Sequence, residues 1–442
     1  MTGRMLLTAD AVITVDDDRR VVTDGAVLVD EGVIVEVGAA DSLRARHSDV
    51  DVVDSPGCVI MPGWINTHAH LAMNVFRGLT DDVTLEEFLE RLIAAEFEVL
   101  SPSTVEAGVR AALAESIRGG VTSALDMYFY PLVARAVAAD AGFRLFNGTT
   151  FVGDADPDGT PFAALLERAE ADCAAVAAAG GTPWLMPHSA YTLSADQLMQ
   201  IADVAARVGA RIHTHCAESP GEMALSDAQH GRRPLGVLDD AGLVGPRTVL
   251  AHMAQTSGAE IALLAERGAA IAHCPASNLK LACGIAPIAE MLASGVLVGL
   301  GTDGAASAGS LDMQQSARLA SLLAKGATRD PLQVPAMEAI AMGTRDSARA
   351  LGRDDLGVVR PGARADLQII DVGGWGTSPR HDPAAQVVYS ATCGDVRHVL
   401  IDGRFVLRDG VLLTIDAEQA SADLEAAATR AREAVTRQRG GA

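Results

Sequence analysis

The sequence has few of the features that bind nucleic acid, cross membranes or build disulfide frameworks. It has no Lys/Arg-rich run, and its 57 acidic residues outnumber 35 basic ones, which gives a formal charge of −22. Such a charge repels a phosphate backbone and excludes nucleic acid as a partner. No apolar run approaches the roughly 18 residues of a membrane span. The six cysteines follow no paired spacing, which indicates buried thiols in a reducing compartment.

The first residues also lack the pattern of a secretory signal. The segment from Met1 to Asp10 reaches an acidic residue before an apolar core of useful length. We therefore expect a soluble, cytoplasmic protein. Apolar residues make up 49% of the 442 positions, enough for a buried core in a barrel plus about one further domain.

The middle of the chain, residues 63–356, has the pattern of parallel βα units. Short apolar runs are each followed by an Ala/Leu-rich helical stretch. Eight strands are predicted, and most end in a polar residue: Trp64–His68, Thr122–Tyr128, Arg144–Thr149, Trp184–His188, Arg211–His215, Val249–His252, Ala269–His273 and Val296–Asp303. Eight such units predict an α/β fold with a closed (β/α)₈ TIM barrel that carries the chemistry.

The two flanks, residues 1–62 and 357–442, are rich in strands without intervening helices. The C-terminal flank predicts strands at Ala365–Asp371, Gln386–Tyr389, Val396–Ile401 and Arg404–Leu407, with Asp402-Gly403 as a hairpin turn. We expect the flanks to pair into one small β-sandwich domain built from both chain termini. Residues 416–437 predict a terminal helix with a largely solvated face, to which we assign no chemistry.

Histidines and acids are placed at several of the predicted strand ends. In His68-Ala69-His70 the period of two places both imidazoles on the same side of a strand. His215 and Asp303 end two further strands, at the face where barrel enzymes carry their active sites. Imidazole and carboxylate are ordinary ligands of zinc and iron. We predict that these four side chains hold one divalent metal ion.

Three more residues belong to this constellation. Glu218 follows His215 by three positions, which places a carboxylate near the metal as a proton carrier, or else a solvated loop glutamate. His252 ends the sixth predicted strand and is a further candidate. His213 faces inward like His215, and we favour a role behind the ligands or in packing.

The combined motifs resemble the amidohydrolase superfamily. The nearest branch is the S-adenosylhomocysteine/5′-methylthioadenosine deaminases and their relatives acting on guanine, 8-oxoguanine, cytosine and triazines. The resemblance covers nearly the whole chain and rests on Pro62-Gly63-Trp64-Ile65-Asn66-Thr67-His68-Ala69-His70, His215-x-x-Glu218, Leu250-Ala251-His252, His273-Cys274-Pro275-Ala276-Ser277-Asn278 and Gly301-Thr302-Asp303-Gly304-Ala305.

The resemblance implies a hydrolytic deaminase with one divalent metal, zinc or iron, that releases ammonia from an aminated N-heterocycle. The implied catalytic residues are Glu218, His252 and Asp303, and the implied substrate contacts are His188, Glu218 and His252. Adenosine-type members use an acid after the first barrel helix and two arginines after strand three. Here no arginine follows strand three, and the acid is displaced to Glu96 or Glu98.

Several alternatives stay open or are disfavoured. The substrate is expected to be a purine base or adenosine-type nucleoside, and a triazine, pterin or other heterocycle amino- or chlorohydrolase is the alternative; a catalytically silent ligand-binding barrel is another. A bridging carboxylated lysine on strand four, as in a binuclear hydantoinase, is disfavoured because the first lysine is Lys280. The only expected partner is a small heterocyclic substrate, and homo-oligomer formation is left open.

Overall fold

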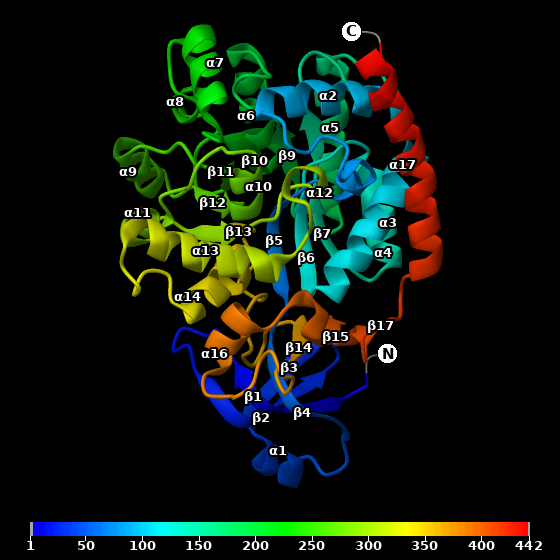
Figure 1. Cartoon of the computed structure of the whole chain (residues 1–442), viewed down its shortest axis with the longest axis vertical. Coiled ribbons are helices and arrows are strands. Elements are labelled where there is room, and N and C mark those ends of the chain that lie inside the picture. The colour runs from blue at the N-terminus through cyan, green and yellow to red at the C-terminus, as the bar shows by residue number, and fades with distance from the viewer. Residues whose placement is uncertain (1–2, 441–442) are drawn as a thin grey trace.

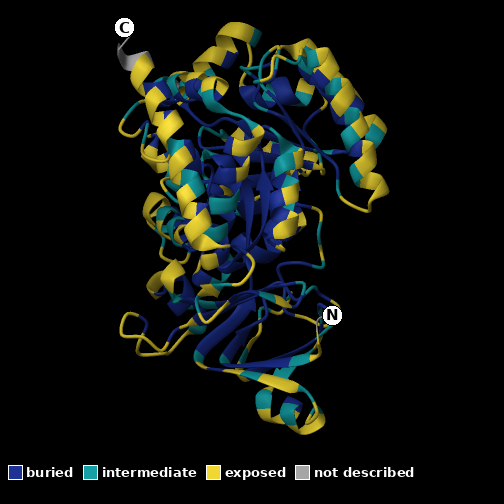
Figure 2. Cartoon of the chain, turned by 90° about the vertical axis from the view of Figure 1, so that its right-hand side faces the viewer, coloured by how far each residue is buried: buried dark blue, intermediate teal, exposed yellow. Residues whose placement is uncertain are grey.

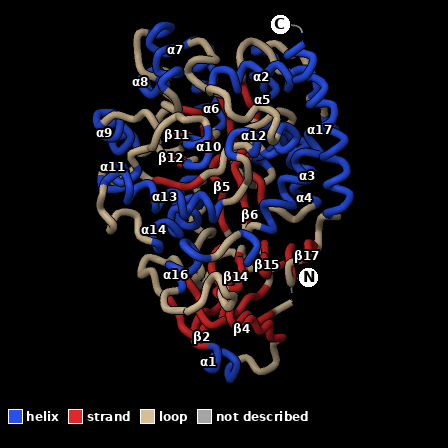
Figure 3. The backbone as a smooth tube through the Cα atoms, viewed as in Figure 1, coloured by secondary structure: helices blue, strands red, loops and turns tan. Residues whose placement is uncertain are grey.

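The computed structural model describes residues 3–440. The chain folds into a barrel of parallel strands covered by helices and a mixed sheet that lies at one end of the barrel (Figure 1). Figure 3 shows the two groups of strands separately, with the barrel strands surrounded by helices. The predicted α/β barrel with a β-domain from both termini is confirmed.

The barrel strands run in parallel around the core. The third strand of the barrel is divided into two short strands. In the described chain these strands are β5 (Trp64–Ala69), β6 (Val121–Asp126), β7 (Arg144–Asn147), β8 (Thr149–Phe151), β9 (Trp184–Pro187), β10 (Arg211–Cys216), β11 (Thr248–His252), β12 (Ala270–His273) and β13 (Val298–Leu300). The end of β13 meets β5, where Thr67 Oγ1 donates to the carbonyl of Leu300 at 2.8 Å. The amide of Asp303 donates to the carbonyl of His68 at 2.9 Å. These contacts bring the last barrel strand beside the first.

Gly148 divides the predicted strand Arg144–Thr149 into β7, which pairs with β6, and β8, which pairs with β9. A Cβ atom at this position would lie 1.9 Å from the carbonyl oxygen of Trp184. Only glycine allows that approach of the two backbones.

Helices cover the barrel, with exposed outer faces and buried inner faces (Figure 2). They include η1 (Leu71–Phe76), α2 (Leu85–Val99), α3 (Pro102–Arg118), α4 (Pro131–Asp140), α5 (Phe162–Ala178), α6 (Ala195–Val208), α7 (Pro220–His230), α8 (Pro234–Asp240), α9 (Gly258–Arg267), α10 (Pro275–Lys280) and α12 (Ala305–Ala308). The remainder are α11 (Ile288–Ala293), α13 (Met313–Thr328), α14 (Ala336–Ala341), η2 (Met342–Asp346) and α15 (Ser347–Ala350).

The terminal domain combines strands from both flanks of the barrel. Its order is β17-β16-β15-β14-β4-β1-β2-β3, so that β4 pairs with β14 across the two flanks. The strands are β1 (Met5–Ile13), β2 (Val21–Asp30), β3 (Val33–Ala39), β4 (Asp51–Pro62), β14 (Leu367–Asp371), β15 (Val396–Ile401), β16 (Arg404–Arg408) and β17 (Val411–Leu412), with α1 (Ala40–Arg46) after β3. They form one hydrogen-bonded sheet, where we had predicted a sandwich. The Asp402-Gly403 hairpin is present, with φ of 49° and 71°.

The predicted strand Gln386–Tyr389 is wrong. These residues form a π-helical turn, η3 (Gln386–Ser390), directly after α16 (Pro383–Ala385), and η4 (Cys393–Asp395) follows. The Asp382 carboxylate accepts the amide of Ala384 at 2.9 Å and so caps a helix at this point. A short apolar run does not by itself distinguish strand from helix.

The terminal helix α17 (Ala417–Gly440) packs along α2 and α3, as Figure 1 shows. Ala427, Ala431 and Val435 on its inner face share one apolar cluster with Leu85 and Phe88 of α2. Helix α17 therefore packs against α2. In residues 3–440 the structure contains no helix with the length and apolar character needed to cross a membrane.

Candidate active site

The four predicted metal ligands come together at the C-terminal end of the barrel. His68 lies in β5 and His70 directly follows it, while His215 lies in β10 and Asp303 follows β13. His70 Nε2 lies 3.2 Å from His215 Nε2 and 3.2 Å from Asp303 Oδ1. His68 Nε2 lies 3.5 Å from the same carboxylate oxygen. All four side chains are buried.

Hydrogen bonds behind His68 fix its tautomer. His213 Nδ1 faces the carbonyl of Val249 at 2.9 Å and must carry the proton, which leaves Nε2 as an acceptor. His68 Nδ1 lies 2.7 Å from that Nε2 and donates to it. His68 Nε2 therefore presents a lone pair, and it is buried without a hydrogen-bond partner among the described residues. The expected role of His213 behind the ligands fits this geometry.

His70 and His215 are oriented in the same way. His70 Nδ1 lies 2.5 Å from the carbonyl of Met127, and His215 Nδ1 lies 2.7 Å from the carbonyl of His188. A carbonyl accepts only, so both Nδ1 atoms are donors and both Nε2 lone pairs face the shared space.

The electrostatics of these groups suit a bound cation. Burial lowers the pKa of His68 to about 3, and burial also lowers the pKa values of His70 and His215. Burial alone would raise the pKa of Asp303, but the adjacent His68 and His70 hold it well below its usual range. Three neutral imidazoles and a carboxylate are the donors that zinc and iron prefer, so the residues fit a divalent metal.

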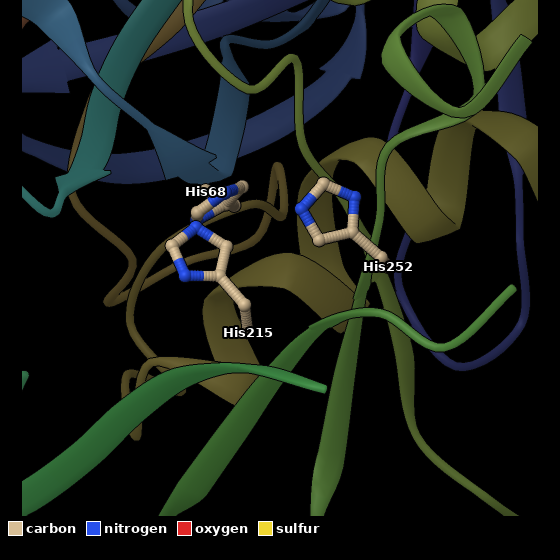
Figure 4. A group of neighbouring side chains, drawn as sticks. All are labelled: His68, His215 and His252. Atoms are coloured by element: carbon tan, nitrogen blue, oxygen red, sulfur yellow. The ribbon is translucent and has the colours of Figure 1, made fainter. Parts of the chain in front are cut away.

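His252 and Glu218 lie beside the ligand cluster. His252 Nε2 is 3.7 Å from Glu218 Oε1, and its Nδ1 is 2.9 Å from Asn278 Oδ1. Figure 4 shows the ring of His252 facing the same space as those of His68 and His215; the nearest ring nitrogens of the three lie within 4.8 Å of one another.

Two hydrogen-bonding residues of the site had no role in our sequence interpretation. Asn278 contacts His252, and Ser277 Oγ donates to Asp303 Oδ2 at 2.6 Å. Both belong to the His273–Asn278 motif at the start of α10, which was the signal available in the sequence.

The backbone around the site adopts a conformation that L-residues rarely take. Ala217, His252, Met253 and Asp303 have φ of 50°, 73°, 51° and 67°, in the left-handed region. Each such residue costs about 1–3 kcal/mol, and neighbouring contacts must hold it. These positions all follow or end barrel strands, so the strain is concentrated where the side chains converge.

A pocket opens above the ligand cluster. Its lining includes His70, His188, His215, His252 and Asp303, together with Glu218. His188 Nδ1 is 3.1 Å from Ser189 Oγ, and its ring lies 4.6 Å from that of His215. The walls are mainly apolar, and the described lining includes no lysine or arginine. The apolar lining residues are Met73, Leu85, Phe88, Leu89, Leu92, Ile93, Phe97, Met127, Phe129, Val152 and Leu281.

The two candidate acids on α2 lie in different surroundings. Glu96 lines the pocket, is buried and accepts a hydrogen bond from the Tyr128 hydroxyl, and burial raises its pKa to about 7. Glu98 forms an exposed ion pair with Arg437 of α17. Of the two, Glu96 is therefore the acid at the pocket.

A divalent-metal donor set, a neighbouring carboxylate and a pocket at the C-terminal mouth of a barrel define the class of metal-dependent barrel hydrolases. The chain belongs to the amidohydrolase family, whose profile matches residues 59–406. Residues 25–47 match a bacterial imidazolonepropionase-like composite domain.

Similar proteins cover nearly the whole chain. A 5-methylthioadenosine/S-adenosylhomocysteine deaminase from Pelotomaculum thermopropionicum is 36% identical over 91% of this chain and 93% of its own length. A 5′-deoxyadenosine deaminase from Methanothermobacter thermautotrophicus is 41% identical over 80% of this chain and 83% of its own. The structure of a Xanthomonas campestris adenosine deaminase with bound zinc superposes with a TM-score of 0.93 at 32% identity, covering 98% and 99% of the two chains.

Proposed function

We propose that this protein is a metal-dependent hydrolase that removes the amino group of an adenosine-type nucleoside as ammonia. The observation that carries the proposal is the convergence of three histidine Nε2 lone pairs and Asp303 beside the Glu218–His252 pair. The names of the similar deaminases support the same reaction. Zinc is the proposed metal because the Xanthomonas structure contains it.

When bound, a divalent ion in this site would lower the pKa of a water molecule towards roughly 7 and so would supply the nucleophile. His68, His70, His215 and Asp303 would hold it, and the hydrogen bonds behind the histidines keep their Nε2 atoms turned toward it.

The side chains around this centre move the protons. Asp303 accepts the proton that the attacking water releases, and the water oxygen bonds to the ring carbon that bears the amino group. Glu218 protonates the adjacent ring nitrogen, so no amide-like anion forms. His252 hydrogen-bonds the attacking oxygen through Nε2, because Asn278 engages its Nδ1. Asp303 then passes its proton to the amino group, the carbon–nitrogen bond breaks and ammonia leaves, and the hydroxyl proton of the intermediate returns to Glu218 as the carbonyl forms.

The pocket suits a flat base with an uncharged extension. The apolar side of α2 offers a surface for the heterocycle, and His188 lines the pocket close to His215. Glu96, held by Tyr128, is the acid that we assign to the ribose hydroxyls.

The experiment is an ammonia-release assay on a panel of adenosine, 5′-deoxyadenosine, 5′-methylthioadenosine, guanine, 8-oxoguanine, cytosine, pterins and triazines. We expect the adenosine derivatives to be deaminated by enzyme loaded with zinc, and activity to disappear after chelation and return with zinc. Turnover confined to triazines or pterins would replace the nucleoside assignment with the alternative heterocycle hydrolase. Release of ammonia from no member would favour a silent ligand-binding barrel.

A further inference from the structure

The start of helix α7 differs from that of two comparable helices in this barrel. Ser219 is the N-cap, and its hydroxyl accepts the amide of Glu222 at 3.0 Å. The Glu222 side chain folds back, and its Oε2 accepts the amide of Glu218 at 2.6 Å. Glu222 is only 3% exposed, so this contact is inside the protein.

Helices α6 and α9 also begin with a serine followed three residues later by a glutamine or glutamate. In α6, Gln197 accepts the amide of its own N-cap, Ser194, at 2.8 Å. In α9, Glu260 accepts the amide of Ser257 at 2.8 Å. Both are ordinary capping boxes. In α7 the acid instead reaches one residue further back, to the residue proposed as the proton carrier.

The backbone just before Glu218, at Cys216 and Ala217, is also held by hydrogen bonds. The carbonyl of Cys216 accepts the amide of Met253 at 3.0 Å, and that of Ala217 accepts the amide of Gln255 at 2.8 Å. Ala217 between them has a φ of 50°. The amides of Met253 and Gln255 thus hold the two carbonyls, and the Glu222 carboxylate holds the amide of Glu218 that follows them. Removal of Glu222 would leave that buried amide unpaired and free the strained backbone to relax.

The second carboxylate oxygen of Glu222 lies in a poorly solvated position. Its Oε1 is buried and has no hydrogen-bond partner among the described residues. Such atoms are rare in folded proteins, and desolvation of a carboxylate oxygen carries a cost. In this protein the desolvated carboxylate of Glu222 is the group that holds the Glu218 amide in position.

We propose that Glu222 is a positioning residue that sets the location of the Glu218 carboxylate through the Glu218 amide. It does not line the pocket, so it acts through Glu218 and not on the substrate. The inference about catalysis rests on the proposed function, and the inference about backbone position does not. A displacement of about 1 Å in a reacting group can lower the rate roughly 10²-fold.

The test compares Glu222→Ala, Glu222→Gln and the matched control Glu260→Ala in the zinc-loaded enzyme. We expect Glu222→Ala to lower kcat about 10- to 100-fold with KM and metal content nearly unchanged. Glu222→Gln should restore most of kcat, because its amide oxygen can accept the Glu218 amide. Glu260→Ala, which removes the acid at the same helix position of α9, should leave kcat within about twofold of wild type.

Two further measurements separate positioning from general damage and from failure of the proposed function. The double variant Glu218→Gln/Glu222→Ala should be no slower than Glu218→Gln alone, because the effect of Glu222 passes through Glu218. Hydrogen exchange of residues 216–222, which needs no substrate, should accelerate in Glu222→Ala and stay slow in Glu222→Gln. Unchanged exchange in Glu222→Ala overturns the backbone role even if the wild type deaminates nothing. Full kcat in Glu222→Ala, or additive losses in the double variant, overturns the catalytic role.

Discussion

His68 Nδ1 donates a hydrogen bond of 2.7 Å to His213 Nε2, and this contact decides which nitrogen of His68 faces the ligand cluster. His213 is in turn fixed by the carbonyl of Val249. These two contacts occupy both nitrogens of His213, so His213 is not placed as a ligand, yet its ring sets the orientation of His68. Partners of this kind are commonly worth 10- to 100-fold in metal affinity.

We therefore expect His213→Ala to weaken zinc binding by about 10- to 100-fold without abolishing it. Competition with a chelator of known affinity measures the change. His398→Ala is the control, since His398 is also a buried histidine but lies in β15 of the terminal sheet. Zinc affinity unchanged by His213→Ala would show that the tautomer of His68 does not depend on this contact.

One divalent ion per chain should be present in the purified protein. His215→Ala removes one of the converging Nε2 atoms, and His68→Ala removes another, so each variant should lose the ion. Elemental analysis of wild type and variants after the same purification provides the measurement. Two equivalents per chain in the wild type would contradict a mononuclear centre.

Substitutions of Glu218 and of Asp303 should have different effects on metal content and on turnover. Glu218→Gln keeps the side-chain shape and should retain zinc, while kcat falls by about 10²–10⁴-fold or more. Asp303→Asn removes a charged donor next to His68 and His70, so zinc and kcat should fall together. A Glu218→Gln enzyme with full zinc and more than about a tenth of wild-type kcat would move the proton carrier to His252 or His188.

The apolar walls of the pocket predict poor use of S-adenosylhomocysteine. Its charged amino-acid end would meet no lysine or arginine among the described lining residues. Leaving such groups unpaired costs about 1–3 kcal/mol each, so kcat/KM should be at least about tenfold below that for 5′-methylthioadenosine. Val152→Arg places a cation after β8 and should narrow the gap. Equal kcat/KM for the two substrates in the wild type would contradict this reading of the walls.

Glu96 predicts a pH dependence of stability. Its folded pKa of about 7 is above the ordinary 4.5, so the folded protein keeps a proton that the unfolded chain has released between these values. Its contribution to stability is present at low pH and is lost as pH rises. From pH 6 to pH 8 the loss is about 1 kcal/mol in the free energy of unfolding.

Glu96→Gln should remove this part of the pH dependence, as measured by urea unfolding of the zinc-loaded protein at both pH values. Glu98→Gln on the same helix is the control, because Glu98 lies at the surface in its pair with Arg437. An equal pH dependence in wild type and Glu96→Gln would show that Glu96 does not titrate as its burial implies.

Much of the barrel and its ligand set could be predicted because the signals are local. The period of two in His68-Ala69-His70 and the polar strand ends depend only on neighbouring residues. The helical period of α2 was also available: Leu85, Leu89, Leu92 and Glu96 all line the pocket, whereas Glu98 does not. That spacing places Glu96, and not Glu98, on the same face of the helix as the three leucines.

Other features depend on contacts between distant segments. The division of strand three at Gly148 depends on Trp184, which lies in another strand. The π-helical turn at Gln386–Ser390 is held by Gln314 of α13, whose amide donates to the carbonyl of Val387 at 2.8 Å. Such partners cannot be read from a window of neighbouring residues.

The packing of α17 on α2 has a consequence for when the enzyme becomes competent during synthesis. Leu85, Phe88 and Leu92 of α2 line the pocket, and they also share an apolar cluster with Ala427, Ala431 and Val435 of α17. Because the ribosome makes α2 and Asp303 before α17, a nascent chain that already contains every predicted metal donor has a pocket wall without the support of α17. We therefore expect substrate binding to require α17, whereas the metal site needs the chain only as far as Asp303.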